Sequence, residues 1–369
     1  MVLQGARDGK AADPEPPGAN GPEGPDAPAA SGGRATLKTI AELTGLHVST
    51  VSRVLNGTTS GARAASAATA ERVRQVAREV GYVPDIQAAG LRRQSSRLLG
   101  VMMARLTDQV LASIYEGVER SASRHGFHTM VSNSWDDPAT RQAHISMLLS
   151  RRVDAMIFGD AHVDGAFLAD FAAHGVPFVL VNRRAGDHPS VTCDDLAGGR
   201  LAAEHLYALG HRRVGVVAGL PYAANGIDRT TAFTRYFAER GHPVPGDRVV
   251  HASFDAAGGA LAAERLLDRA PHPSAIFAVS DFAAIGVLGV LRERGLRAGR
   301  DVAVVGFNDV PIAAQLTIPL SSVRNPMFDV GAQGVDLLVR MMRGEPPERI
   351  TLAPELRVRE SSASPYTGA

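Results

Sequence analysis

The chain has 369 residues, of which 45% are hydrophobic and only 5% aromatic, and its formal net charge is +1. This length is too great for one hydrophobic core, so we expect two or three domains of a soluble, alanine-rich α/β protein. The sequence has no apolar run near the roughly 18–20 residues that cross a bilayer, and no apolar signal-peptide core, which argues against membrane insertion and export. The single cysteine, Cys193, excludes an internal disulfide and a cysteine-rich metal site, as expected in a reducing cytoplasm.

The first 35 residues are rich in proline, glycine and alanine (PEPPGANGPEGPDAPAASGG) and show no apolar period. Such a segment cannot bury enough apolar surface to offset the entropy lost on ordering. We therefore expect a disordered tail over residues 1–35.

The next stretch, TLKTIAELTGLHVSTVSRVLN (36–56), predicts two short helices joined by a tight turn. Apolar residues recur every three or four positions in each half, and Gly45 stands where the first helix must stop. This is the layout of a DNA-reading helix-turn-helix, although an ordinary helical hairpin with a solvated polar face has the same spacing. The side chains expected on the outside of the second helix are Ser49, Ser52, Arg53 and Asn56.

These outer residues suit DNA chemically. The planar donors of Arg53 can bond guanine O6 and N7 together, and Thr50, Ser52 and Asn56 are short enough to reach phosphates. A third helix is expected from about residue 67 to 80, with Ser66 as its N-cap. Between Thr36 and Arg97 the chain carries nine cations and four anions, so positive charge is concentrated around this motif.

The segment TVSRVLNG, preceded by IAELTGL, resembles the start of the LacI/GalR family of bacterial transcription regulators. The resemblance implies that Val48 and Ser49 read bases and that residues 85–92 form a hinge helix whose Leu91 wedges into the minor groove. His47 departs from the family, which usually has a serine there that caps the second helix and touches phosphate. The predicted DNA-binding residues are Thr36, Val48, Ser49, Thr50, Ser52, Arg53, Asn56 and Leu91.

From Leu98 onward, short apolar runs alternate with helical patterns. The runs LLGVMMA, HTMVSN, AMIFG, FVLVN, VGVVAG, VVHAS, AIFAVS and VAVVGF predict buried strands. Strand–helix alternation of this kind indicates doubly wound parallel sheets covered on both faces. Two sheets fit in this length, with the break expected near residues 200–211. The predicted fold is thus α/β, with an all-α helix-turn-helix domain (36–84), a hinge helix and linker (85–97) and two sheet subdomains (98–369).

Polar and aromatic side chains follow most of these strands, where ligands of parallel α/β sheets gather. Amides, carboxylates and an arginine beside aromatic rings suit a polyol, which needs both hydrogen bonds and an apolar face. Each residue alone is as readily explained as a turn residue or a helix cap. The predicted effector-binding residues are Trp135, Asn182, Asn225, Arg229, Phe254, Asp281 and Asn308.

Residues 98–361 resemble the effector domain of the same family, which shares its fold with periplasmic sugar-binding proteins. The matching stretches are RRVDAMIFG, VGVVAG, VSDFAAIGVLGVLRERGLRAGRDVAVVGFND and LRVRES. The resemblance implies that Arg229 holds ligand hydroxyls or a carboxylate, that Phe254 stacks on the ligand and that Asn308 is a polar clamp. The sequence departs from the family at TDQVLASI, at Asn182 and at Asn325, so the ligand itself is not implied.

The predicted architecture is compatible with three classes of function. An enzyme on a doubly wound fold lacks support, because the sequence has no G-x-G-x-x-G after a strand, no P-loop and no G-x-S-x-G elbow. A plain sugar-binding or transport module conflicts with the DNA-reading motif. We therefore predict a cytoplasmic, nucleoid-associated repressor that binds double-stranded operator DNA as a homodimer and responds to a sugar-like or other small polar effector, without catalytic residues, metal or cofactor.

Overall fold

The computed structural model describes residues 35–55, 65–82 and 95–364. The chain divides into two compact units, residues 1–85 and 86–369. The predicted tail up to residue 34, the loop 56–64 with Asn56, and residues 83–94 with Leu91 lie outside the described residues, so the hinge helix stays a prediction. No helix among the described residues is long and apolar enough to cross a membrane.

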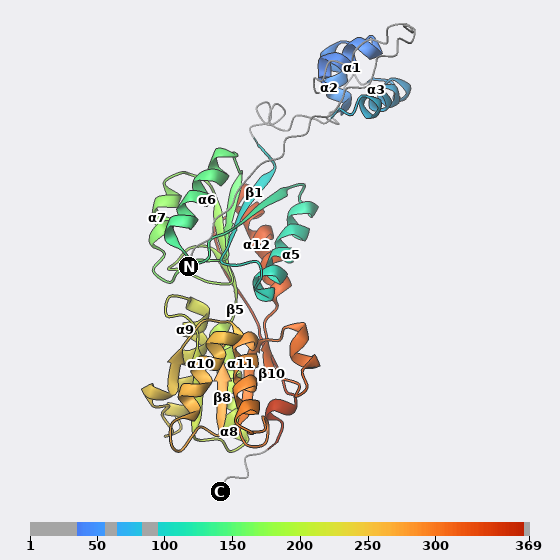
Figure 1. Ribbon diagram of the computed structural model, residues 1–369. Coiled ribbons are helices and arrows are strands. Elements are labelled where there is room, and N and C mark those ends of the chain that lie inside the picture. Colours follow the sequence, from blue (N-terminus) through green and yellow to red (C-terminus); the bar gives the residue numbers. More distant parts are fainter. Residues whose placement is uncertain (1–34, 56–64, 83–94, 365–369) are drawn as a thin grey trace, which may run out of the picture. The chain divides into compact units, whose positions relative to one another are not determined.

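The described part of the first unit consists of three helices, α1 (Leu37–Thr44), α2 (Val48–Leu55) and α3 (Ala67–Glu79) (Figure 1). The Thr36 side chain caps α1, and Gly45 ends it with a left-handed φ of 68° that favours glycine. The predicted cap of α3 is confirmed, since the Ser66 hydroxyl accepts a hydrogen bond from the Thr69 backbone N–H. The residues buried between the helices are Ile40, Ala41, Val51, Val54, Val73 and Ala77.

The second unit contains two six-stranded sheets, which we call the first and second lobes. The first-lobe sheet has the order β11-β5-β4-β3-β1-β2, and all of its pairings are parallel. Helices α5 (Gln109–Arg124) and α12 (Met327–Met342) cover one face, and α6 (Pro138–Ser150) and α7 (Ala166–Ala172) cover the other. The strands are β1 (Leu98–Met103), β2 (His128–Asn133), β3 (Ala155–Phe158), β4 (Phe178–Val181), β5 (Ser190–Cys193) and β11 (Arg349–Leu352).

The second-lobe sheet has the order β12-β10-β9-β8-β6-β7 and is parallel except for the edge strand β12. Helices α8 (Asp195–Ala208) and α9 (Ala224–Ala238) cover one face, and α10 (Ala256–Leu267) and α11 (Asp281–Glu293) cover the other. The strands are β6 (Val214–Ala218), β7 (Val249–His251), β8 (Ala275–Ala278), β9 (Ala303–Asn308), β10 (Ser321–Arg324) and β12 (Glu355–Arg357), with 3-10 turns η1 (Gly246–Arg248), η2 (Pro311–Gln315) and η3 (Glu360–Ser362).

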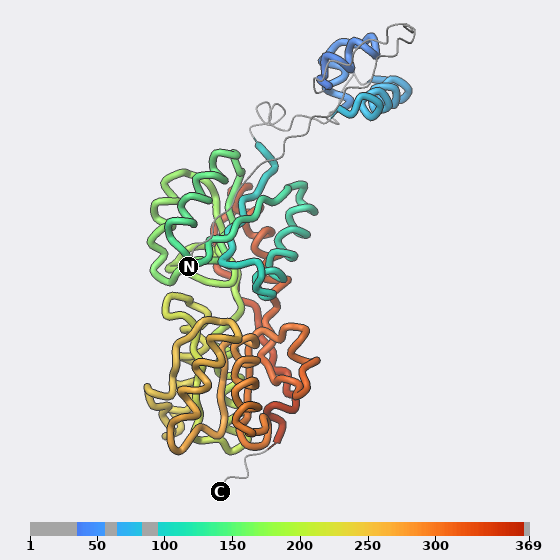
Figure 2. The backbone as a smooth tube through the Cα atoms, in the orientation of Figure 1, coloured from blue at the N-terminus to red at the C-terminus, as the bar shows by residue number. Residues whose placement is uncertain are grey.

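The chain passes between the lobes three times, as Figure 2 lets the reader follow by colour. It leaves the first lobe after β5, returns between β10 and α12, and leaves again between β11 and β12. The predicted break near residues 200–211 was wrong, because that segment is helix α8, which packs on α9 in the second lobe. The first passage falls instead at Cys193–Asp195. Burial raises the pKa of the Cys193 thiol to about 12.

Glycines bring paired helices into close contact. A Cβ added to Gly331 of α12 would lie 1.9 Å from the Ile114 carbonyl oxygen of α5, and one on Gly117 of α5 would lie 2.0 Å from the Phe328 oxygen. Gly259 of α10 and Gly286 of α11 likewise lie against the backbone of the partner helix, where an added Cβ would clash with a carbonyl oxygen. Only a residue without a side chain permits such backbone approach. Each lobe is therefore a tightly packed body.

Candidate DNA interface and effector pocket

The outer face of α2 carries the predicted DNA-reading side chains. Val48 is 40% exposed, and Ser49 and Arg53 are also exposed. The Arg53 Nε donates to the Ser49 carbonyl oxygen at 3.2 Å, and one Arg53 Nη donates to the Thr50 hydroxyl at 3.4 Å. These bonds lay the guanidinium along the helix surface. A second helix of a helix-turn-helix presents its N-terminal residues to base edges in the major groove.

Ser52 does not belong to this outer face. It was expected outside, but it is only 7% exposed. In a helix each residue turns about 100° from the last, so Ser52, next to Val51 and three residues before Leu55, falls at the edge of the buried face. Thr36 is exposed at the start of α1, and Thr50 is half-buried.

The second unit has a pocket between the lobes, with a volume of about 230 Å³. It lies at the carboxyl ends of β1, β2, β4, β6 and β7, where parallel sheets bind ligands. Trp135, 56% exposed, stands on the first-lobe side, and Phe254 and Phe282 stand on the second-lobe side. The full lining is Ala104, Arg105, Thr107, Asp108, Leu111, Trp135, Asp136, Arg183, Leu220, Ser253, Phe254, Asp255 and Phe282.

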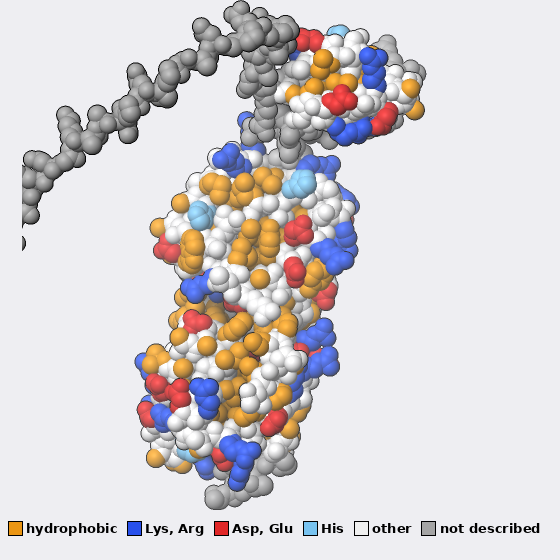
Figure 3. Space-filling view, turned by 45° about the vertical axis from the view of Figure 1, so that its right-hand side comes forward, with side chains coloured by type: hydrophobic (Ala, Val, Ile, Leu, Met, Phe, Trp, Pro, Cys, Tyr) orange, Lys and Arg blue, Asp and Glu red, His pale blue; other side chains and the backbone are white. Residues whose placement is uncertain are grey.

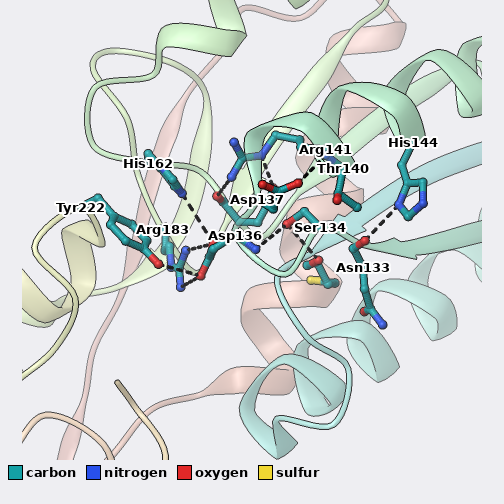
Figure 4. A network of polar contacts seen from close by, with 12 residues as sticks. Asn133, Ser134, Asp136, Asp137, Thr140, Arg141, His144, His162, Arg183 and Tyr222 are labelled. Atoms are coloured by element: carbon teal, nitrogen blue, oxygen red, sulfur yellow. Dashed lines mark hydrogen bonds and ion pairs between the residues drawn. The ribbon is translucent and has the colours of Figure 1, made fainter. Parts of the chain in front are cut away.

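One wall of the pocket is a polar network centred on Asp136 (Figure 4). Arg183 donates to both Asp136 carboxylate oxygens, at 2.7 and 3.2 Å, and the Tyr222 hydroxyl donates to Oδ2 at 3.4 Å. The His162 ring stacks on the Tyr222 ring with centroids 4.2 Å apart. Burial raises the pKa of Asp136, but the His162 ring, whose Nε2 lies 3.7 Å from Oδ1, and the hydrogen-bonded Arg183 guanidinium outweigh burial and hold this pKa well below its usual range. The carboxylate therefore stays ionised.

The same side of the pocket holds the lobes together. Tyr222 belongs to the second lobe, and its carbonyl oxygen accepts from the Val163 N–H of the first lobe at 2.9 Å. Arg184 of the first lobe forms a two-bond ion pair with Asp228 of α9, at 2.8 and 3.0 Å. These contacts would have to change if the lobes opened.

The predicted effector residues Asn182 and Asn225 lie in this interlobe contact. The Asn225 Nδ2 donates to the Asn182 Oδ1 at 3.3 Å, across the lobes. Asn182 is 8% exposed and Asn225 is 6% exposed, and neither contributes to the pocket lining.

Arg229 lies behind the pocket and not in its lining. It is the sixth residue of α9, the helix that follows β6, and is only 2% exposed. Its Nε donates to the Asp195 carboxylate at 2.8 Å, its Nη1 donates to the Val279 carbonyl oxygen at 2.8 Å, and its guanidinium lies 3.6 Å from the centre of the Phe307 ring. Burial raises the pKa of Asp195 to about 6, against the lowering effect of Arg229.

Asp281 and Asn308 also lie away from the lining. The N-cap of α11 is Ser280 and not Asp281. The Asp281 carboxylate accepts hydrogen bonds from the Val310 N–H at 2.8 Å and from the Ser322 hydroxyl at 2.6 Å. Burial raises the pKa of Asp281 to about 7. The Asn308 Oδ1 accepts from Asn325 Nδ2 at 3.2 Å. Of the seven predicted effector residues, the structure brings Trp135 and Phe254 together in the lining.

Sequence reasoning missed Arg105 and Asp108, which follow β1 and line the pocket. The Asp108 carboxylate caps α5 by accepting from the Val110 N–H, and burial raises its pKa. The available signal was the segment TDQVLASI, since polar residues between a strand and a helix occupy the ligand-bearing edge. His162 and Tyr222 carried no such signal, because only folding brings them together.

Comparisons with known proteins agree along the chain. Residues 36–85 match the model of bacterial regulatory proteins of the lacI family, and residues 203–362 match that of periplasmic binding protein-like domains. The transcriptional regulator CelR of Thermobifida fusca is 31% identical over 337 residues, covering 88% of this chain and 98% of CelR. The regulator DegA of Bacillus subtilis is 28% identical, covering 89% of this chain and 98% of DegA.

Solved structures are similar over the same length. The lac repressor dimer bound to operator and the anti-inducer ONPF is 25% identical with a TM-score of 0.82, covering 89% of this chain and 99% of that one. The CelR–cellobiose complex is 30% identical with a TM-score of 0.68, covering 89% and 100%. The chain therefore belongs to the LacI family of bacterial regulators and is a helix-turn-helix, DNA-binding transcriptional regulator.

Proposed function

We propose that this regulator is a repressor whose affinity for operator DNA is set by an uncharged, hydroxyl-rich ligand bound between the lobes. The pocket, lined by side chains of both lobes, is the observation that carries the proposal. Its lining has two arginines and three aspartates, and the Arg183–Asp136 pair neutralises itself. Three aromatic rings add apolar faces. Acceptors, donors and rings together suit a sugar or similar polyol better than an anion.

Ligand binding is coupled to DNA through the interlobe contacts. A ligand that prefers one separation of the lobes shifts the population toward it, by typically about 1–3 kcal/mol of coupling free energy. The Arg184–Asp228 ion pair and the Tyr222 contacts are the bonds that such a shift would make or break. The protein binds its ligand and returns it unchanged, and is not an enzyme.

The proposed assembly is a cytoplasmic homodimer. Figure 3 shows hydrophobic side chains gathered along one face of the second unit, over both lobes. Large exposed hydrophobic residues of this unit include Leu261, Ile312 and Phe328. Contiguous apolar surface of this kind marks protein interfaces. A dimer places two recognition helices about one turn of DNA apart on a near-palindromic site. Light scattering that gave a concentration-independent tetramer would contradict this assembly.

The test is a thermal-shift screen of sugars, polyols and nucleosides, followed by a DNA mobility-shift assay with each ligand that stabilises the protein. We expect an uncharged sugar to raise the melting temperature and to change operator affinity. A ligand that is consumed during the assay would point to an enzyme. A stabilising anion without any stabilising sugar would contradict the proposed ligand class.

The DNA-reading part of the proposal predicts the effect of Arg53→Ala. This change should remove about 1–3 kcal/mol of discrimination at one G·C pair in each half-site, because the bidentate guanine contact is lost. Arg72→Ala on α3 removes one positive charge from the first unit, as Arg53→Ala does, and should weaken binding to all DNA sequences by the same factor. Binding-site selection with both variants measures the difference. An unchanged base preference in Arg53→Ala would contradict the assigned face of α2.

The pocket predicts the effect of Phe254→Ala. Loss of the ring should weaken ligand binding by about 1–3 kcal/mol, because burial and stacking are lost. DNA binding in the absence of ligand should be unchanged. Tyr236→Ala, which removes a half-buried ring of α9 outside the lining, is the matched control. Calorimetry with the ligand found by the screen compares the two. Equal affinities in all three proteins would place the ligand elsewhere.

A further inference from the structure

The residue before α2 makes an unusual contact with a side chain on the DNA-reading face. His47 Nδ1 lies 2.8 Å from the Ser49 hydroxyl oxygen and 3.3 Å from the Ser49 backbone nitrogen, whose N–H points to it. Both side chains are exposed. His47 is also the residue at which this chain departs from the usual serine of its family.

The two distances together decide which group donates. A backbone N–H can only donate, so Nδ1 must accept and carries no proton. The Ser49 hydroxyl therefore donates its hydrogen to the same Nδ1 atom. The exposed Ser49 oxygen then has only its lone pairs to offer to a further partner.

The direction of this hydroxyl matters for base reading. In the major groove adenine N6 and cytosine N4 are donors, whereas guanine O6, guanine N7 and thymine O4 are acceptors. A freely rotating serine can bond to either kind of group, because its hydroxyl both donates and accepts. A serine whose hydrogen is already taken can only accept from an amine.

We propose that His47 is a positioning residue that fixes the Ser49 hydroxyl as a hydrogen-bond acceptor, so that α2 selects adenine or cytosine at the base Ser49 contacts. The proposal rests on the DNA-reading role proposed for the outer face of α2. His47 itself need not touch a base; it acts by removing one of the two bonding modes of its neighbour.

Three variants separate this role from helix capping. Ser49→Ala removes the hydroxyl and identifies the base pair it reads. His47→Ser keeps a good N-cap but releases the Ser49 hydroxyl, and His47→Asp keeps both a cap and an acceptor that has no hydrogen to donate at neutral pH. Circular dichroism should find the three helices folded in each variant.

The experiment is binding-site selection from a random DNA library with the full-length protein and these variants. We expect the wild type to favour adenine or cytosine at one position by roughly 2- to 10-fold, the contribution of a single hydrogen bond. Ser49→Ala and His47→Ser should lose that preference. His47→Asp should retain it while binding every sequence more weakly, because its charge repels phosphate.

The outcomes that overturn the proposal are distinct. If His47→Ser keeps the wild-type preference, or if the base read by Ser49 is guanine or thymine, His47 does not set the hydroxyl direction. If the Arg53-dependent G·C preference is present but no position depends on Ser49, this proposal fails while DNA reading by α2 stands. If the wild-type protein selects no DNA sequence, both the proposed role of His47 and DNA reading by α2 are contradicted.

An atom-level measurement completes the test. Where the selected base is adenine, replacing it with 2-aminopurine removes the 6-amino group from the major groove while pairing with thymine is kept. The affinity of the wild type for this DNA should then fall by the same factor of roughly 2 to 10, and the affinity of His47→Ser should fall by less. Equal losses in both proteins would contradict the proposed role of His47.

Discussion

Arg229→Ala is expected to lower the free energy of unfolding of the second unit by about 3–5 kcal/mol at neutral pH. The change leaves the Asp195 carboxylate buried without its ion-pair partner, and it strips a donor from the Val279 carbonyl oxygen. It also removes the guanidinium that packs against Phe307. Chemical denaturation followed by fluorescence or circular dichroism measures the loss.

The size of this loss should depend on pH. Asp195 has a pKa raised to about 6 in the folded protein, above its ordinary value of 3.8, so the stability linked to its proton is present below about pH 4 and is lost as pH rises through 6. Without the guanidinium the folded-state pKa rises further, and the loss continues to higher pH. The gap between variant and wild type should therefore be larger at pH 8 than at pH 5.

A double variant, Arg229→Met with Asp195→Leu, provides the control. It replaces the buried pair with apolar side chains and should recover much of the lost stability, because no charge is left unpaired. A gap in Arg229→Ala that is the same at both pH values would show that the ion pair is not its cause. If Arg229→Ala loses ligand affinity but keeps the stability of the wild type, Arg229 contacts the ligand directly, as the family resemblance implies.

Gly331→Ala is expected to destabilise the second unit by about 1–3 kcal/mol or more. The new methyl carbon would lie 1.9 Å from the Ile114 carbonyl oxygen, so α12 and α5 would have to move apart. Gly289→Ala is the matched control within α11, because no heavy atom lies within 4 Å of the added carbon. Alanine there should stabilise the helix by up to about 1 kcal/mol. Thermal unfolding that lowered the melting temperature of both variants equally would contradict the packing argument.

The elements that the sequence predicted well are those with continuous apolar runs. The strands β5 and β10 were missed because they read SVTC and SSVR, with small polar residues in place of valine and leucine. Both are nevertheless buried for most of their length. In β10 the hydroxyls have partners inside the fold, since Ser321 donates to the Arg359 carbonyl oxygen and Ser322 donates to Asp281. Hydrophobic patterning cannot detect a strand whose polar groups are satisfied by distant segments.

The site was predicted only in part for a related reason. The rule that ligands gather at strand ends located Trp135 and Phe254, which line the pocket. The same rule also selected Arg229 and Asp281, whose charges are neutralised or bonded inside the second lobe. A carboxylate or guanidinium at a strand end has the same appearance in sequence whether it faces a ligand or a buried partner. Tertiary contacts alone make that distinction.

The three passages between the lobes have a consequence for synthesis on the ribosome. The strands β1 to β5 emerge early, but the first lobe also needs α12 and β11, which lie at residues 327–352. Until those residues emerge, one face of its sheet is covered by α5 alone, and the edge of β5 has no neighbour. Chains generally fold domain by domain from the N-terminal side as they are made. Here the first lobe must wait for residues 327–352, and the second lobe must wait for its own edge strand β12 at residues 355–357, so neither sheet can be completed until its own late segment has been made.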